Sequence, residues 1–232
     1  MNRKIVFAPD EFYHLYNRGT DRREIFLDDR DRRRFVALLY LCNGTKSINM
    51  RDIMGGGYTY EELFQYDRGV PLVAIGAYCL MDNHFHLLIK EKNDQGISRF
   101  MQKFITAYAM YFNLRHKRSG TLFQGRFNAE HADSDEYLKY LYAYIHLNPV
   151  KTVDLGWSEG RIASPRKAEQ YLKNYEYSSF LDYDNARTRP VKNILAPQEF
   201  PEYFQNPSDF AEMIKEWLNF DKGQTFAKVR PL

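Results

Sequence analysis

Residues 70–90 have the sequence VPLVAIGAYCLMDNHFHLLIK, and this stretch decides the fold. Its first part, Val70 to Cys79, is apolar and β-branched enough for a buried strand. Met81-Asp82-Asn83 supplies turn residues, and His84 to Lys90 is a second strand-like run. Two such runs joined by a short turn predict a β-hairpin.

Further elements are predicted on both sides of this hairpin. Apolar side chains at helical spacing and start signals such as Ser134, a plausible N-cap, indicate helices. We expect a strand at 12–17, a loop or short strand at 120–130, and helices at 28–43, 98–117, 135–147 and 207–220. Strands mixed with helices, with a hairpin in the sheet, indicate an α+β fold rather than a doubly wound parallel sheet.

Length and composition are those of a globular protein. The 232 residues are 44% hydrophobic and 27% charged, which argues against disorder and coiled coils. A net charge of +3 does not by itself indicate a nucleic-acid-binding protein. Cys42 and Cys79 lie in apolar runs and are expected to be reduced and buried. The run Leu72 to Met81 is about half of a membrane span, and the N-terminus lacks the apolar region of a secretory signal. We therefore expect a soluble, cytoplasmic protein.

His84-Phe85-His86 is the sharpest chemical signal in the sequence. Alternate residues of a strand face the same side, so both imidazoles project together and Phe85 faces the other way. Two histidines at this spacing can hold one divalent metal ion. A pair of this kind is a weak motif by itself, and two histidines of a half-buried strand that bond to backbone or water would give the same pattern.

The segment Tyr144-Ile145-His146-Leu147-Asn148-Pro149 is the second signal. Tyr144 and Asn148 are four residues apart and share one face of a helix that Pro149 stops. An asparagine oxygen can serve as a third metal ligand, and a phenol beside a metal-bound phosphate can act as a nucleophile. The alternative is core packing, because the aromatic residues of this helix form a stripe at helical spacing.

Basic residues interleaved with aromatic ones form the third signal. Cations contact phosphates, and exposed aromatic rings can stack on unpaired bases. A solvated basic helix face above a buried aromatic face would give the same pattern. The candidate DNA-binding residues are Arg99, Lys103, Arg115, Lys117, Arg118 and Arg126, with Arg18 and Arg22 in a second basic turn.

Five segments together resemble the REP-associated tyrosine transposases, a branch of the single-tyrosine HUH transposases of bacterial insertion sequences. Each motif is weak alone, but their common order along the first two-thirds of the chain is specific. The resemblance implies a ferredoxin-like antiparallel sheet with helices packed on it, the histidine pair on a central strand, and a C-terminal helical appendage. The segments are YHLYNRGTDRREIF (13–26), AYCLMDNHFHLLI (77–89), GISRFMQKFITAYAMYFN (96–113), GTLFQGRF (120–127) and YIHLNPVKT (144–152).

The same resemblance implies a mechanism. His84, His86 and Asn148 match the metal ligands of the family, and Tyr144 matches its nucleophile. The ion, Mg²⁺ or Mn²⁺, would polarise a phosphate of a single-stranded DNA hairpin, and the tyrosine would form a 5′-phosphotyrosine that leaves a free 3′-OH. Rejoining reverses this reaction, so no nucleotide cofactor is expected. A phenol with a pKa of about 10 needs such a cation nearby to act as a nucleophile.

Some features depart from the family pattern. Asp82 stands where the family commonly has proline, which adds a carboxylate near the expected metal. Residues 44–69 resemble an insertion of little periodicity on the surface. We expect a catalytic domain over 1–185 and a partly helical appendage over 186–232.

Several alternatives fit the sequence. The chain could be an active nicking and strand-transfer enzyme, a catalytically idle protein that binds DNA or RNA hairpins, or a phosphodiesterase that uses water. Tyr108 and Tyr111 are rival nucleophiles, and Arg126 could pair with a carboxylate instead of a phosphate. Because one tyrosine handles one break at a time, transposition at two ends would need a homodimer or successive reactions.

Overall fold

The computed structural model describes residues 5–154, 162–184, 188–204 and 206–219. One antiparallel sheet has the order β2-β3-β1-β4, and its strands are β1 (Phe12–Arg18), β2 (Val73–Met81), β3 (His84–Glu91) and β4 (Asn128–His131). Helix α1 (Asp29–Leu41) follows β1, and α3 (Gly96–Arg115) follows β3. This βαββαβ sequence with its strand order is the ferredoxin-like arrangement. The predicted α+β fold and its hairpin are confirmed.

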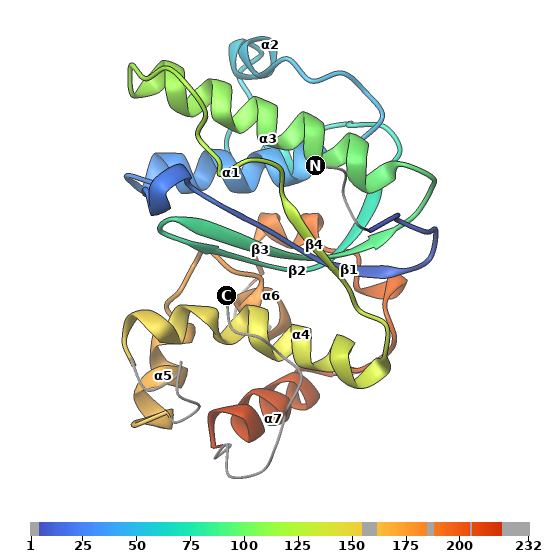
Figure 1. Ribbon diagram of the computed structural model, residues 1–232, viewed down its shortest axis with the longest axis vertical. Coiled ribbons are helices and arrows are strands. Elements are labelled where there is room, and N and C mark those ends of the chain that lie inside the picture. Colours follow the sequence, from blue (N-terminus) through green and yellow to red (C-terminus); the bar gives the residue numbers. More distant parts are fainter. Residues whose placement is uncertain (1–4, 155–161, 185–187, 205, 220–232) are drawn as a thin grey trace.

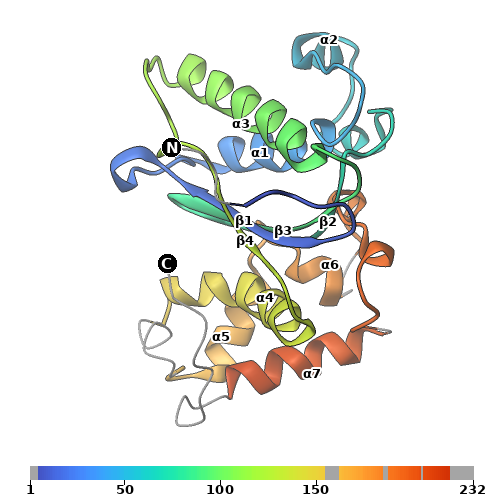
Figure 2. The same ribbon diagram turned by 45° about the vertical axis from the view of Figure 1, so that its right-hand side comes forward.

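Helices cover both faces of the sheet. Helices α1 and α3 lie on one face, and α4 (Asp135–Leu147) lies across the other (Figure 1). Figure 2 shows the same three layers from a second direction, with α7 (Pro207–Leu218) outside α4. Two shorter helices, α5 (Pro165–Leu172) and α6 (Phe180–Asp184), complete the α4 side. The histidine strand β3 is therefore an inner strand between two helical layers.

Side chains at the helix starts satisfy free backbone N–H groups. Asp28 accepts from the Asp31 backbone N at 3.1 Å, and Ser134 accepts from the Tyr137 backbone N at 3.3 Å. The buried Glu91 carboxylate at the end of β3 accepts from the first two N–H groups of α3, at 2.6 and 2.8 Å. This contact satisfies two free N–H groups at the start of α3 and connects that helix to the end of β3.

The alternation along β3 divides the core into two parts. Phe85 and its alternate neighbours pack into an aromatic cluster with Phe35 of α1 and Phe104 of α3. Leu88 faces the other way and packs with Ile145 of α4. The face that carries His84 and His86 is thus the α4 face, as the period of two requires.

The C-terminal part of the described chain packs directly against β2. Backbone N–H groups of Leu80 and Ser179 bond to Tyr177 and Tyr78 at 2.9 and 3.0 Å, which covers the outer edge of this strand. The Ala196 N–H bonds to Ile75 O at 2.9 Å. Residues 186–187, 205 and 220–232 of the expected appendage, and the end of the expected helix 207–220, lie outside the described residues.

Residues 44–69 are expected to form a surface excursion, and most of them are exposed or half-buried, but three apolar side chains of this segment enter the core. Ile53 of α2 (Met50–Gly55), Leu63 and Phe64 are buried in the cluster under α1. Cys42 and Cys79 are buried free thiols, as predicted. Within the described chain, no helix combines the length and apolar character that a membrane crossing needs.

Candidate functional site

The two histidines of β3 project side by side toward α4. Their ring centroids are 5.0 Å apart, with the ring planes nearly perpendicular. His86 is fully buried, and His84 is half-buried near the open end of the strand. The expectation that both share one face, with Phe85 on the other, is confirmed.

Helix α4 brings Tyr144 onto the histidines. The Tyr144 ring centroid lies 5.5 Å from that of His86. Asn148, one turn later, begins the 3-10 turn Asn148–Thr152 and donates its side-chain N–H to the Tyr144 backbone O at 3.0 Å. Residues that are more than fifty positions apart in sequence are thus adjacent, because α4 packs across β2 and β3.

Unpartnered polar atoms mark the same place. In the described residues, three buried side-chain nitrogen or oxygen atoms have no hydrogen-bond partner: Thr20 Oγ1, His86 Nε2 and Asn148 Oδ1. Leaving such an atom without a partner costs about 1–3 kcal/mol, and a bound ligand would satisfy His86 Nε2 and Asn148 Oδ1. An imidazole nitrogen and an amide oxygen both bind divalent cations. The residues therefore fit a metal ion, although no cluster of three His, Cys, Asp or Glu side chains that could hold one occurs in the described chain.

Burial keeps both imidazoles of β3 neutral. Desolvation, followed by the positive charge of Lys151, lowers the pKa of His84 to about 4. Desolvation, with the neighbouring histidines, lowers the pKa of His86 well below its ordinary value. Neutral imidazoles have a free lone pair, which is the form that binds metal. Burial also raises the pKa of the Tyr144 phenol, and the Asn148 amide offsets part of that rise.

Lys151 belongs to this site and was missed in the sequence. Its Nζ lies 3.5 Å from the Tyr144 phenol oxygen and 5.0 Å from the centre of that ring. The Lys151 side chain is half-buried, and desolvation lowers its pKa. Lys151 lies seven residues after Tyr144 and beyond Pro149. Because helical spacing does not extend through a proline, the sequence does not predict this contact.

A polar group on β1 and β4 also adjoins the histidines. His14 Nε2 lies 2.9 Å from His86 Nδ1, and Glu130 Oε2 lies 3.9 Å from the other ring nitrogen of His14. The phenols of Tyr16 and Tyr137 donate to the two Glu130 oxygens at 3.1 and 3.0 Å. His14, followed by these two phenols, holds the pKa of Glu130 down at about 2. Only the pairing register places these residues beside β3, and the sequence gives no register between distant strands.

The rival tyrosines lie in the other helical layer. The Tyr108 phenol donates to Ile25 O at 2.5 Å within the aromatic cluster of α1 and α3. Tyr111 donates to an Asp31 oxygen at 3.1 Å. The sheet separates both phenols from His84 and His86, whereas Tyr144 lies on the histidine face.

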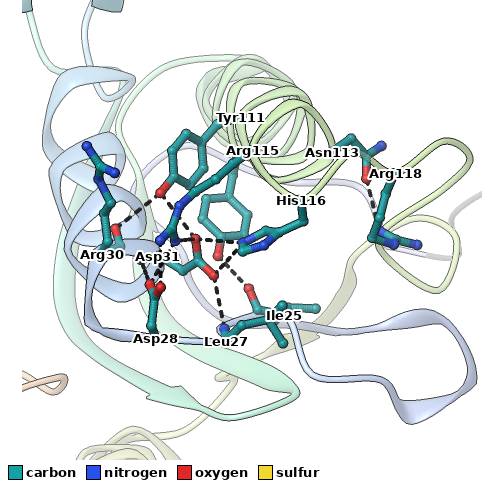
Figure 3. Close-up of polar contacts among 11 residues, drawn as sticks. Ile25, Leu27, Asp28, Arg30, Asp31, Tyr111, Asn113, Arg115, His116 and Arg118 are labelled. Carbon is teal, nitrogen blue, oxygen red and sulfur yellow. Dashed lines mark hydrogen bonds and ion pairs between the residues drawn. The ribbon is translucent and has the colours of Figure 1, made fainter.

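Three of the eight basic candidates have intramolecular partners that account for them. Arg115 pairs with Asp28 and the buried Asp31 at 2.5 Å each, and His116 joins the same carboxylate at 2.9 Å (Figure 3). Arg118 donates to the Asn113 side chain at 2.9 Å in the same view. Lys103 donates to the backbone oxygens of Gly44 and Lys46. The Arg115 and Lys103 contacts connect α3 with α1 and with the segment after α1, and the Arg118 contact joins the end of α3 to the residues that follow it.

The other candidates are exposed, and three of them flank the histidine site. Arg18 pairs in register with His84 and donates to Gln124 at 2.5 Å. The Arg22 backbone O accepts from Asn83, which directly precedes His84, and Arg126 follows Gln124 in the adjoining loop. Lys117 lies just after α3, and Arg99 lies near the start of that helix. Asp82, expected near the metal, is exposed and pairs with Arg32 at 2.7 Å.

A family of known proteins matches part of this chain. Residues 61–148 match the family described as "Transposase IS200 like". The resemblance to a transposase family is thereby confirmed over a segment that contains the histidine pair, Tyr144 and Asn148. The matched residues 61–148 contain all of β2, β3, α3, β4 and α4, while β1 and Lys151 lie outside them.

A solved structure is also similar to this chain. It is described as "Structure of the REP associates tyrosine transposase bound to a REP hairpin", with 13% sequence identity, a TM-score of 0.49, and coverage of 82% of this chain and 89% of that one. No curated protein matches the chain.

Proposed function

We propose that this protein nicks and rejoins single-stranded DNA at hairpin elements through a covalent tyrosine intermediate, and so carries out DNA transposition. One observation carries the proposal: the Tyr144 phenol, the Lys151 ammonium group and two unpartnered ligand atoms, His86 Nε2 and Asn148 Oδ1, meet on one face of the sheet. The IS200-like transposase match over residues 61–148 supports the same reaction class.

The proposed metal ligands are His84, His86 and Asn148. A set of two imidazoles and one amide suits Mn²⁺, and Mg²⁺ when waters complete its coordination. When bound, such an ion supplies positive charge that polarises the phosphodiester.

Tyr144 performs the covalent step. Its phenol oxygen attacks the phosphorus, the new phosphotyrosine bond forms, and the bond from phosphorus to O3′ breaks. The phenol loses its proton and the departing O3′ gains one, which leaves a 5′-phosphotyrosine and a 3′-OH. Lys151 donates to the phenol oxygen and stabilises negative charge on it as the proton leaves. Attack by a 3′-OH on the phosphotyrosine reverses the step, so the bond energy is conserved and no nucleotide cofactor is needed.

The exposed cations around the His84 end of the sheet form the proposed DNA contact. Arg18 pairs with His84 in the sheet, Arg22 lies in a segment bonded to Asn83, and Arg126 lies two residues after Gln124, the partner of Arg18; each of these cations can neutralise a phosphate. Two-end transposition would use a homodimer or two successive reactions, since each chain offers one such tyrosine. The substrate would place the protein at the bacterial nucleoid.

A covalent-adduct assay tests the proposal. Purified protein is incubated with a labelled single-stranded hairpin library and Mn²⁺, beside Tyr144→Phe, Tyr108→Phe and His84→Ala/His86→Ala, and products are separated on denaturing gels. We expect an SDS-resistant protein–DNA band from wild type and Tyr108→Phe that Tyr144→Phe and the double histidine variant lose. Hairpin binding without any band would indicate the idle binding protein. Cleavage without an adduct that persists in Tyr144→Phe would indicate a phosphodiesterase that uses water.

A further inference from the structure

His14 occupies a buried position between His86 and Glu130. Its Nε2 is 2.9 Å from His86 Nδ1, and its Nδ1 is 3.9 Å from the nearer Glu130 oxygen. The imidazole is 3% exposed, and its ring stacks on that of His86 with an interplanar angle of 19°. The three side chains come from β1, β3 and β4, so the sheet register holds them in line.

For a hydrogen bond to form between His14 Nε2 and His86 Nδ1, one of these two nitrogens must carry a proton and the other a lone pair. The groups around the two rings determine which nitrogen carries the proton. If His86 donates from Nδ1, its Nε2 keeps a lone pair. His14 then accepts at Nε2 and carries its own proton on Nδ1, toward the Glu130 carboxylate.

The opposite arrangement is unfavourable at both ends. His86 would then carry its proton on Nε2, a buried atom with no hydrogen-bond partner in the described chain. His14 would direct the lone pair of Nδ1 toward the negative Glu130. The buried proton without an acceptor and the repulsion between lone pair and carboxylate both disfavour this state.

Two tyrosine phenols hold the Glu130 carboxylate in position beside His14. Tyr16 donates to one of its oxygens and Tyr137 to the other, at 3.1 and 3.0 Å. Since both phenols donate, the carboxylate stays an acceptor for the His14 side.

We propose that His14 and Glu130 are positioning residues that hold His86 in the tautomer with its proton on Nδ1, so that the Nε2 lone pair is free for the proposed metal ion. This inference rests on the proposed function for the identity of the ligand, but the tautomer itself is a property of the free protein. His84 has a simpler arrangement, because its Nδ1 donates to the adjacent Asn83 Oδ1 at 2.6 Å. Two histidines on one strand are thus oriented by different partners.

The first test is long-range ¹H–¹⁵N NMR of the histidine rings in metal-free, DNA-free protein. We expect the Nδ1–H form for His86 in wild type, and loss of that preference in His14→Phe. An Nε2–H form in wild type would overturn the proposal, whatever the adduct assay shows.

The second test measures Mn²⁺ affinity from the EPR signal of the free ion. His14→Phe should weaken binding by about 10- to 100-fold, the usual effect of removing the partner of a metal-binding histidine. His14→Gln, whose amide oxygen can still accept from His86 Nδ1, should stay within a few-fold of wild type, and Glu130→Gln should fall in between. His131→Phe, at a 40% exposed position on β4, is the matched control and should bind as wild type.

Equal Mn²⁺ affinity in His14→Phe and wild type would overturn the positioning role. Melting in EDTA checks that the variants fold, and if His14→Phe does not fold, the wild-type tautomer and His14→Gln still decide the question. Absence of an adduct together with normal Mn²⁺ binding would contradict the proposed function and leave this inference standing.

Discussion

The Lys151 ammonium group lies 3.5 Å from the phenol oxygen of Tyr144, in the 3-10 turn that follows the helix carrying the tyrosine. We expect Lys151→Met to reduce the rate of covalent-adduct formation by about 10- to 1,000-fold, because it removes a charge aimed at the atom that becomes negative. Lys151→Arg should retain part of the rate. Rates are measured with a cleavable hairpin at saturating Mn²⁺, and hairpin affinity is measured separately.

Lys173→Met is the control for this prediction. Lys173 is an exposed lysine directly after α5 that pairs with Glu169 of that helix, so its loss should leave the rate unchanged. A Lys151→Met protein that forms adduct at the wild-type rate would show that the ammonium group has no part in the chemistry.

Metal should stabilise the fold through the unpartnered atoms. A ligand at 100 times its Kd stabilises the native state by about 2.7 kcal/mol, so wild type should melt at a clearly higher temperature in Mn²⁺ than in EDTA. Asn148→Leu removes Oδ1 and should lose most of this rise, and Asn148→Asp should keep it. Thr20→Val is the control, since it removes the unpartnered Thr20 hydroxyl and should leave the Mn²⁺ response intact.

The spacing of residues within a single strand or helix predicted which side chains of that element share a face of the site. The period of two along β3 places His84 and His86 on one face, and the helical spacing of α4 places Tyr144 above Asn148. The hairpin and the helices of the fold followed from the same local signals.

Contacts between distant segments could not be predicted in this way. His14 reaches His86 only because β1 and β3 pair in one register among several that the sequence allows. Arg115 looks like a DNA contact in the sequence, but its carboxylate partner Asp31 is 84 residues away. Phe64 lies in a segment without hydrophobic periodicity, yet its side chain is fully buried because it packs into the cluster under α1.

Gly76 permits the C-terminal segment to lie on the sheet. A methyl group at this position would lie 2.6 Å from the Phe200 ring and 2.8 Å from the Tyr142 hydroxyl oxygen. Gly76→Ala should therefore destabilise the protein by about 1–3 kcal/mol through overpacking. In urea unfolding, the double variant Gly76→Ala/Phe200→Leu should lose less unfolding free energy than the sum of the losses in the two single variants. Gly55→Ala, where a methyl group meets nothing within 4 Å, is the matched control.

Substitution of Arg115 should lower stability, whereas substitution of Arg22 should weaken the salt dependence of hairpin binding. Arg115→Met leaves the buried Asp31 without its guanidinium partner and should cost about 3 kcal/mol of unfolding free energy. Arg22→Met should change stability by less than about 0.5 kcal/mol but lower the salt dependence of hairpin binding by about one unit in the log–log slope. The two properties are measured by urea unfolding and by fluorescence anisotropy between low and high salt. A reduced salt slope in a fully folded Arg115→Met protein would contradict this assignment.

The pair between Asp28 and Arg115 should make stability depend on acid pH. The Arg115 guanidinium holds the pKa of the Asp28 carboxyl well below its usual range, whereas the unfolded chain has the ordinary value of about 3.9. The contribution of this carboxylate is therefore fully present above pH 4 to 5 and is lost as pH falls further, because the unfolded state then binds the proton first. Asp28→Asn keeps the helix cap, since asparagine accepts from the same N–H group. Urea unfolding should show a difference between wild type and Asp28→Asn that is constant from about pH 7 to 5 and shrinks below about pH 4. In an Arg115→Met background the difference should be small at every pH, and a difference that persists unchanged there would show that another group, not Arg115, stabilises the carboxylate.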